Sequence, residues 1–247
     1  MDELTYERAV FLSPHHDDIC FSVACIALRQ TSRALVNIFT RSEYVAKGIP
    51  LPTERDERIA FITGLRTAED ERFAAVGGLT RHDLKLSEPG VRGFASFDSR
   101  DLDSEVGHVE FALQLFFDNA AGVRQQSALF CPMGIGGHRD HLLTLLAVKA
   151  MMPLLQNRFD VFLYEDLHYS SVSSVRQAGI GRAMATMSGF NLSRIRYSLS
   201  RDLFAQKLEL IALYDSQFKS SIRPEDFIPA DNEAPTPHEA VWRCIAD

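Results

Sequence analysis

Short apolar runs alternate along most of the chain with longer segments of helical periodicity. Continuous apolar runs of about four to eight residues are typical of buried strands, and apolar residues three or four apart are typical of helices packed on one side. The predicted strands are residues 7–12, 34–40, 84–86, 127–131, 161–167, 195–199 and 240–244. The first predicted helix is capped by Asp17 or Asp18 and runs through Phe21, Ala24, Cys25 and Leu28. The other predicted helices are residues 54–63, 67–76, 102–121, 142–155 and 201–218.

Strands that alternate with helices predict an α/β fold, Rossmann-like in topology, with three layers and a mainly parallel sheet. A length of 247 residues suits a single domain of this kind. The alternation weakens in the last third of the chain. We therefore expect one domain over residues 1–247, with a core at about 7–170 and a small C-terminal extension at about 171–247.

The charge balance narrows the range of partners. The chain has 26 Lys and Arg against 33 Asp and Glu, a net charge of −7, and a nucleic-acid partner would need a basic surface. Its apolar runs are far shorter than the ~20 residues of a membrane span. The four cysteines show no CxxC spacing, which favours reduced, structural thiols. We expect a cytoplasmic protein that binds neither nucleic acid nor membrane.

Two clusters of histidine and aspartate directly follow predicted strands, the first after residues 7–12 and the second after residues 127–131. A parallel sheet brings such strand ends to one edge. Burying these groups without a partner would be costly, and a divalent metal accepts neutral imidazole and carboxylate together. Three such donors suffice to hold zinc with a fourth position left for water. The titratable members are His15, His16, Asp17 and Asp18 in the first cluster and His138, Asp140 and His141 in the second.

The two clusters resemble the motifs of the PIG-L/LmbE family of zinc-dependent N-deacetylases. That family carries His-x-Asp-Asp after its first strand and His-x-Asp-His later, as residues 15–18 and 138–141 do here. The likeness covers about residues 8–170 and departs from the family pattern at His16, Ile19 and Arg139. Further similar segments are Phe39-Thr40-Arg41-Ser42, Arg66-Thr67-Ala68-Glu69 and Tyr164-Glu165-Asp166-Leu167.

The resemblance implies a metal held by His15, Asp18 and His141, with Asp17 as the general base. His138 would stabilise the oxyanion or protonate the leaving amine. Several alternatives stay open. The three ligands would otherwise only cap helices, Asp17 would only orient a histidine, and His138 would be a fourth ligand that closes the site.

The remaining candidate residues are expected to support the site or to bind substrate. Asp140 would orient His138 or another imidazole, and His16 would line the pocket or pack on the surface. Arg66 would reach the pocket, unless it pairs with a carboxylate on its own helix. Three more candidates lie at strand ends near the same edge of the predicted sheet, namely Arg41, Tyr164 and Glu165.

The residues alone support metal-assisted amide hydrolysis. The resemblance adds the substrate class: an N-acetylated amino sugar or glycoside, including intermediates of secondary metabolism, from which an acetyl or similar small acyl group is removed. Zn²⁺ is the expected metal, and Fe²⁺ would accept the same ligands. The alternatives are a hydrolase of a larger amide conjugate at the same site and a non-catalytic, metal-containing sugar- or protein-binding module. The sequence leaves a homo-oligomer open.

Overall fold

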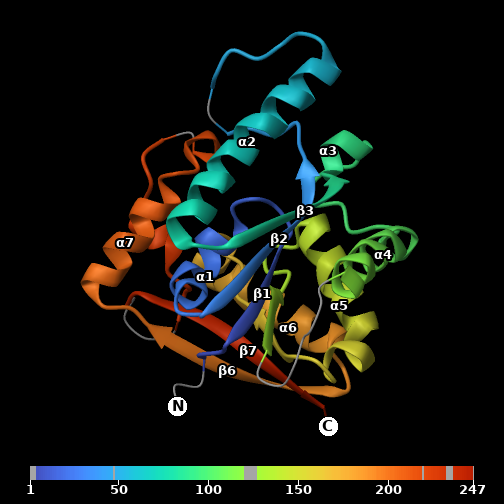
Figure 1. The fold of residues 1–247 in the computed structure, drawn as a ribbon, viewed down its shortest axis with the longest axis vertical. Helices are drawn as coiled ribbons and strands as arrows, with labels where there is room; N and C mark the ends of the chain where they lie inside the picture. The colour runs from blue at the N-terminus through green and yellow to red at the C-terminus, as the bar shows by residue number, and fades with distance from the viewer. Residues whose placement is uncertain (1–3, 47, 120–126, 219, 232–235, 247) are drawn as a thin grey trace.

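The computed structural model describes residues 4–46, 48–119, 127–218, 220–231 and 236–246. Within these residues a seven-stranded sheet has the order β3-β2-β1-β4-β5-β7-β6 (Figure 1). Strands β1 to β5 pair in parallel, and β7 runs antiparallel to both of its neighbours. The prediction of an α/β fold with a mainly parallel sheet is confirmed. The strands are β1 (Arg8–Ser13), β2 (Ser32–Arg41), β3 (Thr80–Ser87), β4 (Ser127–Pro132), β5 (Asp160–Tyr164), β6 (Phe190–Ser198) and β7 (His238–Ala246).

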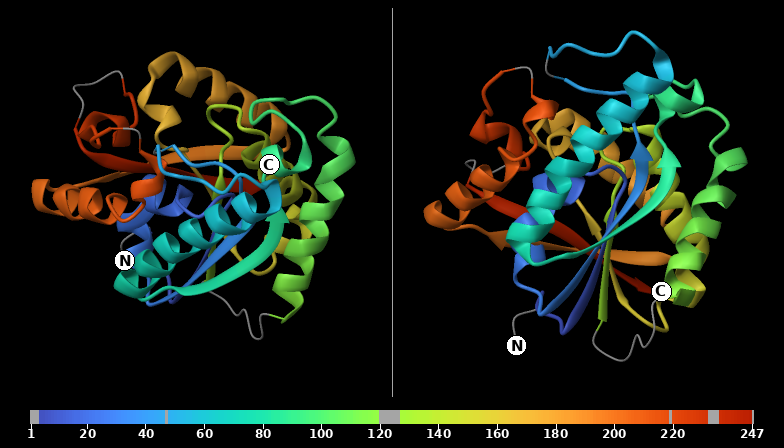
Figure 2. Two further views of the ribbon diagram at one scale, coloured as in Figure 1. Left: turned by 90° about the horizontal axis from the view of Figure 1, so that it is seen from above. Right: turned by 45° about the horizontal axis from the view of Figure 1, so that its top comes forward.

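Helices cover both faces of the sheet (Figures 1 and 2). Residues of α1, α2 and α7 share one buried cluster with one face, and residues of α4, α5 and α6 share a second cluster with the other. The α-helices are α1 (Asp18–Leu28), α2 (Arg55–Gly77), α3 (Pro89–Arg92), α4 (Asp103–Asn119), α5 (Arg139–Leu155), α6 (Ser173–Thr186) and α7 (Arg201–Ile211). Short 3₁₀ turns are η1 (Tyr169–Ser171), η2 (Asp215–Gln217) and η3 (Pro224–Phe227).

The central strand β1 is buried on both sides, which explains its continuous apolar run. Ala9 and Phe11 face the cluster of α1, α2 and α7, while Val10 and Leu12 face that of α4, α5 and α6. Strands covered on both faces read as apolar throughout rather than as alternating. The Phe11 ring also stacks on Phe130 of β4, with ring centroids 4.7 Å apart. These contacts fix β1 beside β4 and so place their two following turns side by side.

Two helix predictions are wrong in their bounds. The predicted helices 54–63 and 67–76 form the single helix α2, because one internal glycine, Gly64, costs only about 1 kcal/mol in a helix of this length. The helix does stop where predicted, at Gly78 with a φ of 61°. The predicted helix 201–218 ends at Ile211 and continues into the turn η2. Helix α6 was not predicted. In the described part of the chain, no helix is both long enough and apolar enough to span a membrane.

Candidate active site

The two predicted clusters meet at the carboxyl edge of the sheet. Asp18 opens α1 directly after β1, while His138 caps α5 after β4. Because β1 and β4 are paired, these turns are neighbours. The β4–α5 turn contains Gly136, whose φ is 93° and where an added Cβ would meet the Tyr169 ring at 2.4 Å. Glycine is therefore required there for the turn to present its histidines.

Donor atoms of His15, Asp18 and His141 form a triangle in which each imidazole meets a different oxygen of the Asp18 carboxylate. His15 Nδ1 lies 3.4 Å from Asp18 Oδ2 and 3.4 Å from His141 Nε2. His141 Nε2 lies 3.3 Å from Asp18 Oδ1. A tetrahedral zinc ion with bonds of about 2.0–2.1 Å separates its donors by about 3.3–3.4 Å. The three side chains therefore offer donors at about the spacing of ligands around one tetrahedral cation.

His138 stands close enough to be considered as a fourth donor. One ring nitrogen each from His15, His138 and His141 lies within 4.8 Å of the other two. The His15 and His138 rings meet edge to face, with centroids 4.6 Å apart. The geometry is therefore compatible with both predicted roles of His138, as a reacting group and as a metal ligand.

A carboxylate holds each of the imidazoles of His15 and His141 from behind. His15 Nε2 lies 3.0 Å from Asp140 Oδ2, and His141 Nδ1 lies 2.6 Å from Asp166 Oδ1. Such pairs fix the orientation and tautomer of a metal-binding histidine. Asp140 thus orients His15. Sequence reasoning did not single out Asp166; its signal was its position, two residues beyond the end of β5 at the same edge.

The charges around the triangle compensate one another. Burial by itself would lower the pKa of both imidazoles, yet Asp140 and Asp18 raise the pKa of His15 well above its usual value. Asp18 and Asp166 likewise raise the pKa of His141 to about 9. Burial would raise the pKa of Asp18, but His141 and His15 hold it well below its ordinary range. Without a metal, protons on the imidazoles therefore supply the positive charge that a cation would bring.

Asp17 is tied to the buried guanidinium of Arg66. Arg66 Nη2 donates to Asp17 Oδ1 at 3.1 Å, and Nη1 donates to Ser42 Oγ at 3.1 Å and to Glu88 Oε1 at 2.5 Å. The carboxylate expected as its partner on the same helix, Glu69, instead accepts from the hydroxyl and backbone of a serine in η2. Arg66 is thus a link between α2 and the site, and Glu88 is a member that sequence reasoning missed.

His138 is a neutral imidazole with an assignable tautomer. Burial, together with the neighbouring imidazoles of His15 and His141, lowers the pKa of His138 far below its usual value. Its Nδ1 accepts a hydrogen bond from the backbone N–H of Asp140 at 3.3 Å. The ring proton therefore lies on Nε2, which can donate to an oxyanion.

Comparison with known proteins points to deacetylases. No protein-family model matches the chain. The 2'-N-acetylparomamine deacetylase of Streptomyces fradiae is 27% identical over 178 residues, which are 68% of this chain and 60% of that protein. The resemblance to the PIG-L/LmbE deacetylases is confirmed. The chain spans less than two thirds of the length of this curated relative, and the matched part contains too little of that protein to transfer its activity outright.

Solved structures of deacetylases share the fold. The zinc-inhibited form of teicoplanin deacetylase Orf2 superposes with a TM-score of 0.70 at 18% identity, covering 97% of this chain and 98% of the other. The pseudoaglycone deacetylase Dbv21 superposes with a TM-score of 0.65 at 15% identity, covering 98% of each chain. At these identities the likeness establishes the fold.

A cavity of about 700 Å³ opens over the three donors. Asp17, Arg66 and Glu88 line its floor beside the histidines. Residues between α7 and β7, such as Phe218 and Phe227, contribute much of its wall. The aromatic residues that line the cavity are Phe21, Tyr44, Phe97, Tyr169, Phe218 and Phe227. Of these, Phe97 is 60% exposed and Tyr44 is 55% exposed, so both offer apolar surface to a ligand.

Six of the candidate residues do not line this cavity: His141 and Asp140, which lie behind His15 and Asp18, and Arg41, Tyr164, Glu165 and His16. Arg41 is exposed at the end of β2. Tyr164 is buried and donates its hydroxyl to the Leu12 carbonyl at 3.0 Å, and Glu165 is buried against two arginines. The expectation that Tyr164 or Glu165 faces substrate is therefore wrong. His16 was expected in the pocket or on the surface, but it is fully buried behind the turn.

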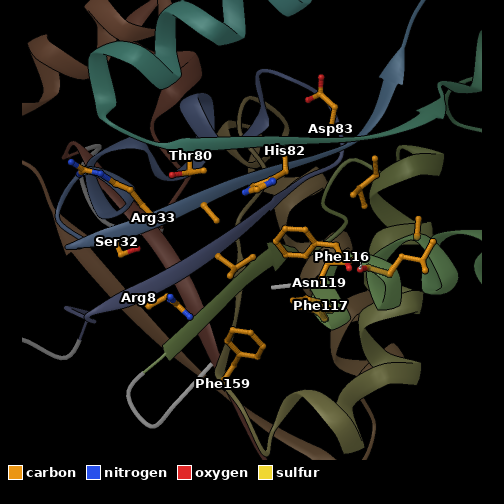
Figure 3. A pocket seen from close by; sticks show the side chains of 15 residues that line it. Arg8, Ser32, Arg33, Thr80, His82, Asp83, Phe116, Phe117, Asn119 and Phe159 are labelled. Atoms are coloured by element: carbon orange, nitrogen blue, oxygen red, sulfur yellow. Dashed lines mark hydrogen bonds between the residues drawn. The ribbon is translucent and has the colours of Figure 1, made fainter. Parts of the chain in front are cut away.

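A second cavity, of about 590 Å³, lies at the opposite edge of the sheet (Figure 3). It opens beside the starts of β1, β2 and β3, where Arg8, Arg33 and Thr80 line it, and the end of α4 closes it with Phe116 and Phe117. None of the predicted metal ligands reaches it. The chemistry of the two clusters therefore belongs to the first cavity.

Proposed function

We propose that this protein is a zinc-dependent N-deacetylase that removes an acetyl or similar small acyl group from an N-acylated amino sugar or an amino-sugar-containing metabolite. The triangle of His15 Nδ1, Asp18 and His141 Nε2 at the floor of a cavity carries the proposal. The activity of the relative from Streptomyces fradiae, deacetylation of 2'-N-acetylparomamine, supports the substrate class.

The donor set fits a catalytic metal. His15, Asp18 and His141 would hold it, with Asp140 and Asp166 keeping the two rings in place. A zinc ion held there would polarise the amide carbonyl and lower the pKa of water from about 15.7 toward about 7. Iron(II) accepts the same imidazole and carboxylate donors.

Asp17 is the general base of the proposed reaction. It lines the cavity next to Asp18, and Arg66 fixes its Oδ1. The carboxylate takes a proton from the water that attacks the amide carbon. The same proton then passes to the nitrogen of the leaving amino sugar as the C–N bond breaks, so acetate and a free amine are released.

His138 stabilises the oxyanion that forms on the amide. Its lowered pKa makes it a poor proton donor to the amine, while Nε2–H remains free to donate a hydrogen bond. Removing one such donor from a hydrolase typically slows turnover by about 100- to 1,000-fold. Of the two reacting roles expected for His138, this favours stabilisation of the oxyanion over protonation of the leaving amine.

The cavity wall supports a sugar-containing substrate larger than a monosaccharide. Its volume lies within the range of about 300–1,000 Å³ that is usual for small-molecule sites. Exposed aromatic rings such as Phe97 and Tyr44 suit the apolar faces of sugar rings. The same open wall also leaves room for a longer acyl group, which keeps hydrolysis of a larger amide conjugate as the second candidate.

The test is acetate release by the zinc-loaded protein from N-acetylglucosamine derivatives and from 2'-N-acetylparomamine. We expect zinc-dependent release that Asp17→Asn abolishes while zinc content stays unchanged. Asp202→Asn, at an exposed position outside the cavity, is the matched control. A binding module would hold zinc and release no acetate. A hydrolase of larger amides would turn over N-octanoyl substrates faster than N-acetyl ones.

A further inference from the structure

His16 is a buried imidazole that the proposed reaction does not use. Its side chain is fully buried, and neither ring nitrogen has a hydrogen-bond partner among the residues that the structure describes. A buried polar atom left unpaired costs about 1–3 kcal/mol.

Two carboxylates from other elements face this ring. A ring nitrogen of His16 and one oxygen each from Asp70 of α2 and Asp83 of β3 lie within 4.8 Å of one another. Asn37 Nδ2 draws the carboxylates together by donating to Asp70 Oδ2 at 2.6 Å and to Asp83 Oδ1 at 3.2 Å. Donors to a cation with bonds of about 2.1 Å lie about 3.0 Å apart when adjacent and about 4.2 Å apart when opposite. The three groups therefore lie close enough together for small side-chain adjustments to bring them onto one ion.

The local charge also leaves room for a cation. Arg81 is the basic partner of both carboxylates, with Nε 2.5 Å from Asp70 Oδ2 and Nη2 2.7 Å from Asp83 Oδ2. Arg81 Nη1 also lies 3.8 Å from Glu71 Oε1. One arginine therefore faces three carboxylates, and the local charge is net negative.

The cluster can be reached from solvent, and it is separate from the first cavity. The Asp83 side chain is 20% exposed, which gives an ion a route inward. None of His16, Asp70 and Asp83 lines the cavity over the His15 site. Asp83 and His82 both line the second cavity, and in Figure 3 their side chains lie on opposite sides of β3.

We propose that His16, Asp70 and Asp83 form a second divalent-cation site. One imidazole nitrogen and two carboxylate oxygens suit Zn²⁺ or Mn²⁺. An ion held there would join the β1–α1 turn, which carries His15, Asp17 and Asp18, to α2 and β3. The site stands on its own donors and does not depend on the deacetylase activity.

Zinc titration of the metal-stripped full-length protein, followed by isothermal calorimetry and by metal analysis after dialysis, tests the proposal. We expect two equivalents per chain in the native protein and in the Asp202→Asn control. His141→Ala should retain one equivalent, bound by the second site. Asp83→Asn and His16→Gln should each retain one equivalent, bound by the first.

A further variant distinguishes a cation site from a plain ion-pair network. Arg81→Gln removes the competing positive charge, so zinc should bind the second site at least about tenfold more tightly. In an ion-pair network this change would create no zinc binding. Far-UV circular dichroism checks that each variant is folded, and His16→Gln carries the test if Asp83→Asn does not fold.

The proposal would be overturned if the native protein bound one zinc equivalent per chain. It would also be overturned if the His141→Ala variant bound no zinc. Two equivalents in both Asp83→Asn and His16→Gln would overturn it as well. These measurements need no substrate. If the protein binds two zinc equivalents but does not deacetylate the substrates, the proposed function is refuted and the second site is not. If the protein is active but binds one zinc equivalent, the second site is refuted and the proposed function is not.

Discussion

His141 Nδ1 lies 2.6 Å from Asp166 Oδ1, and both side chains are about 1% exposed. This contact joins the first turn of α5 to the residue pair that follows β5, and it turns His141 Nε2 toward Asp18 and His15. Asp140 holds His15 in the same way. The donor triangle is therefore arranged by two buried carboxylates before any cation arrives.

Replacing Asp166 should weaken zinc binding without removing a ligand. In Asp166→Asn the His141 ring loses its charged partner, and we expect zinc affinity to fall by roughly 10- to 100-fold. Competition with a chromogenic chelator measures this, with Asp202→Asn as control. Affinity equal to that of the native protein would mean that Asp166 does not hold the ring in solution.

Replacing Asp17 should separate chemistry from metal binding. Asp17→Asn keeps the shape of the side chain but cannot accept a proton from water, so kcat should fall by about 100- to 10,000-fold. Zinc content should stay as in the native protein. Near-native turnover would remove Asp17 from the role of base, and a lost zinc ion would make it a ligand.

Zinc affinity should rise with pH. The pKa values of His15 and His141 are raised in the metal-free protein, that of His141 to about 9, so their protons must leave before zinc binds. Affinity should therefore be weak near pH 6, increase toward pH 9 and level off above the His141 pKa. At pH 7 we expect about one to two protons to be released per zinc ion.

Calorimetry in buffers of different ionisation enthalpy measures this proton release. The Asp83→Asn variant is the protein to use, so that only the His15, Asp18 and His141 donors bind the ion. Zinc binding with no net proton release at pH 7 would show that these imidazoles are already neutral, contrary to the charges described above.

Replacing Phe97 should affect substrate binding more than turnover. Phe97 is 60% exposed, lines the cavity, and contacts the His138 ring at a centroid distance of 5.6 Å. Loss of one aromatic contact worth about 0.5–1.5 kcal/mol raises KM by roughly 2- to 10-fold. Phe111→Ala, at a 66% exposed position on α4, is the control. Equal effects of both variants would show that Phe97 does not contact the substrate.

The sequence predicted that the two clusters meet because each cluster follows a continuous apolar strand. The fully buried runs in β1 and β4 marked both strands, and parallel pairing then brought His15, Asp18 and His141 to one edge. Local periodicity also sufficed for most helices, although it split α2 at Gly64.

Contacts between single, distant residues could not be predicted in this way. Asp166, Glu88 and Arg92 reach the site from separate elements. Asp166 lies in the segment 164–167 that resembles the family, but nothing in that segment marks it as the partner of His141. Arg92 is found at the site through its hydrogen bond to Asp140. The direction of the His16 side chain could not be predicted either, since neighbouring residues in a turn point to different sides. Strand order was hidden as well: β7, the last strand of the sequence, lies between β5 and β6.

The most direct test of the account is a crystal structure of the zinc-loaded protein with anomalous data collected at the zinc edge. We predict an anomalous peak about 2.0–2.2 Å from His15 Nδ1, Asp18 Oδ and His141 Nε2, with the fourth position taken by water or substrate. A peak elsewhere in this cavity, or one whose four ligands are all protein atoms including His138, would contradict the account.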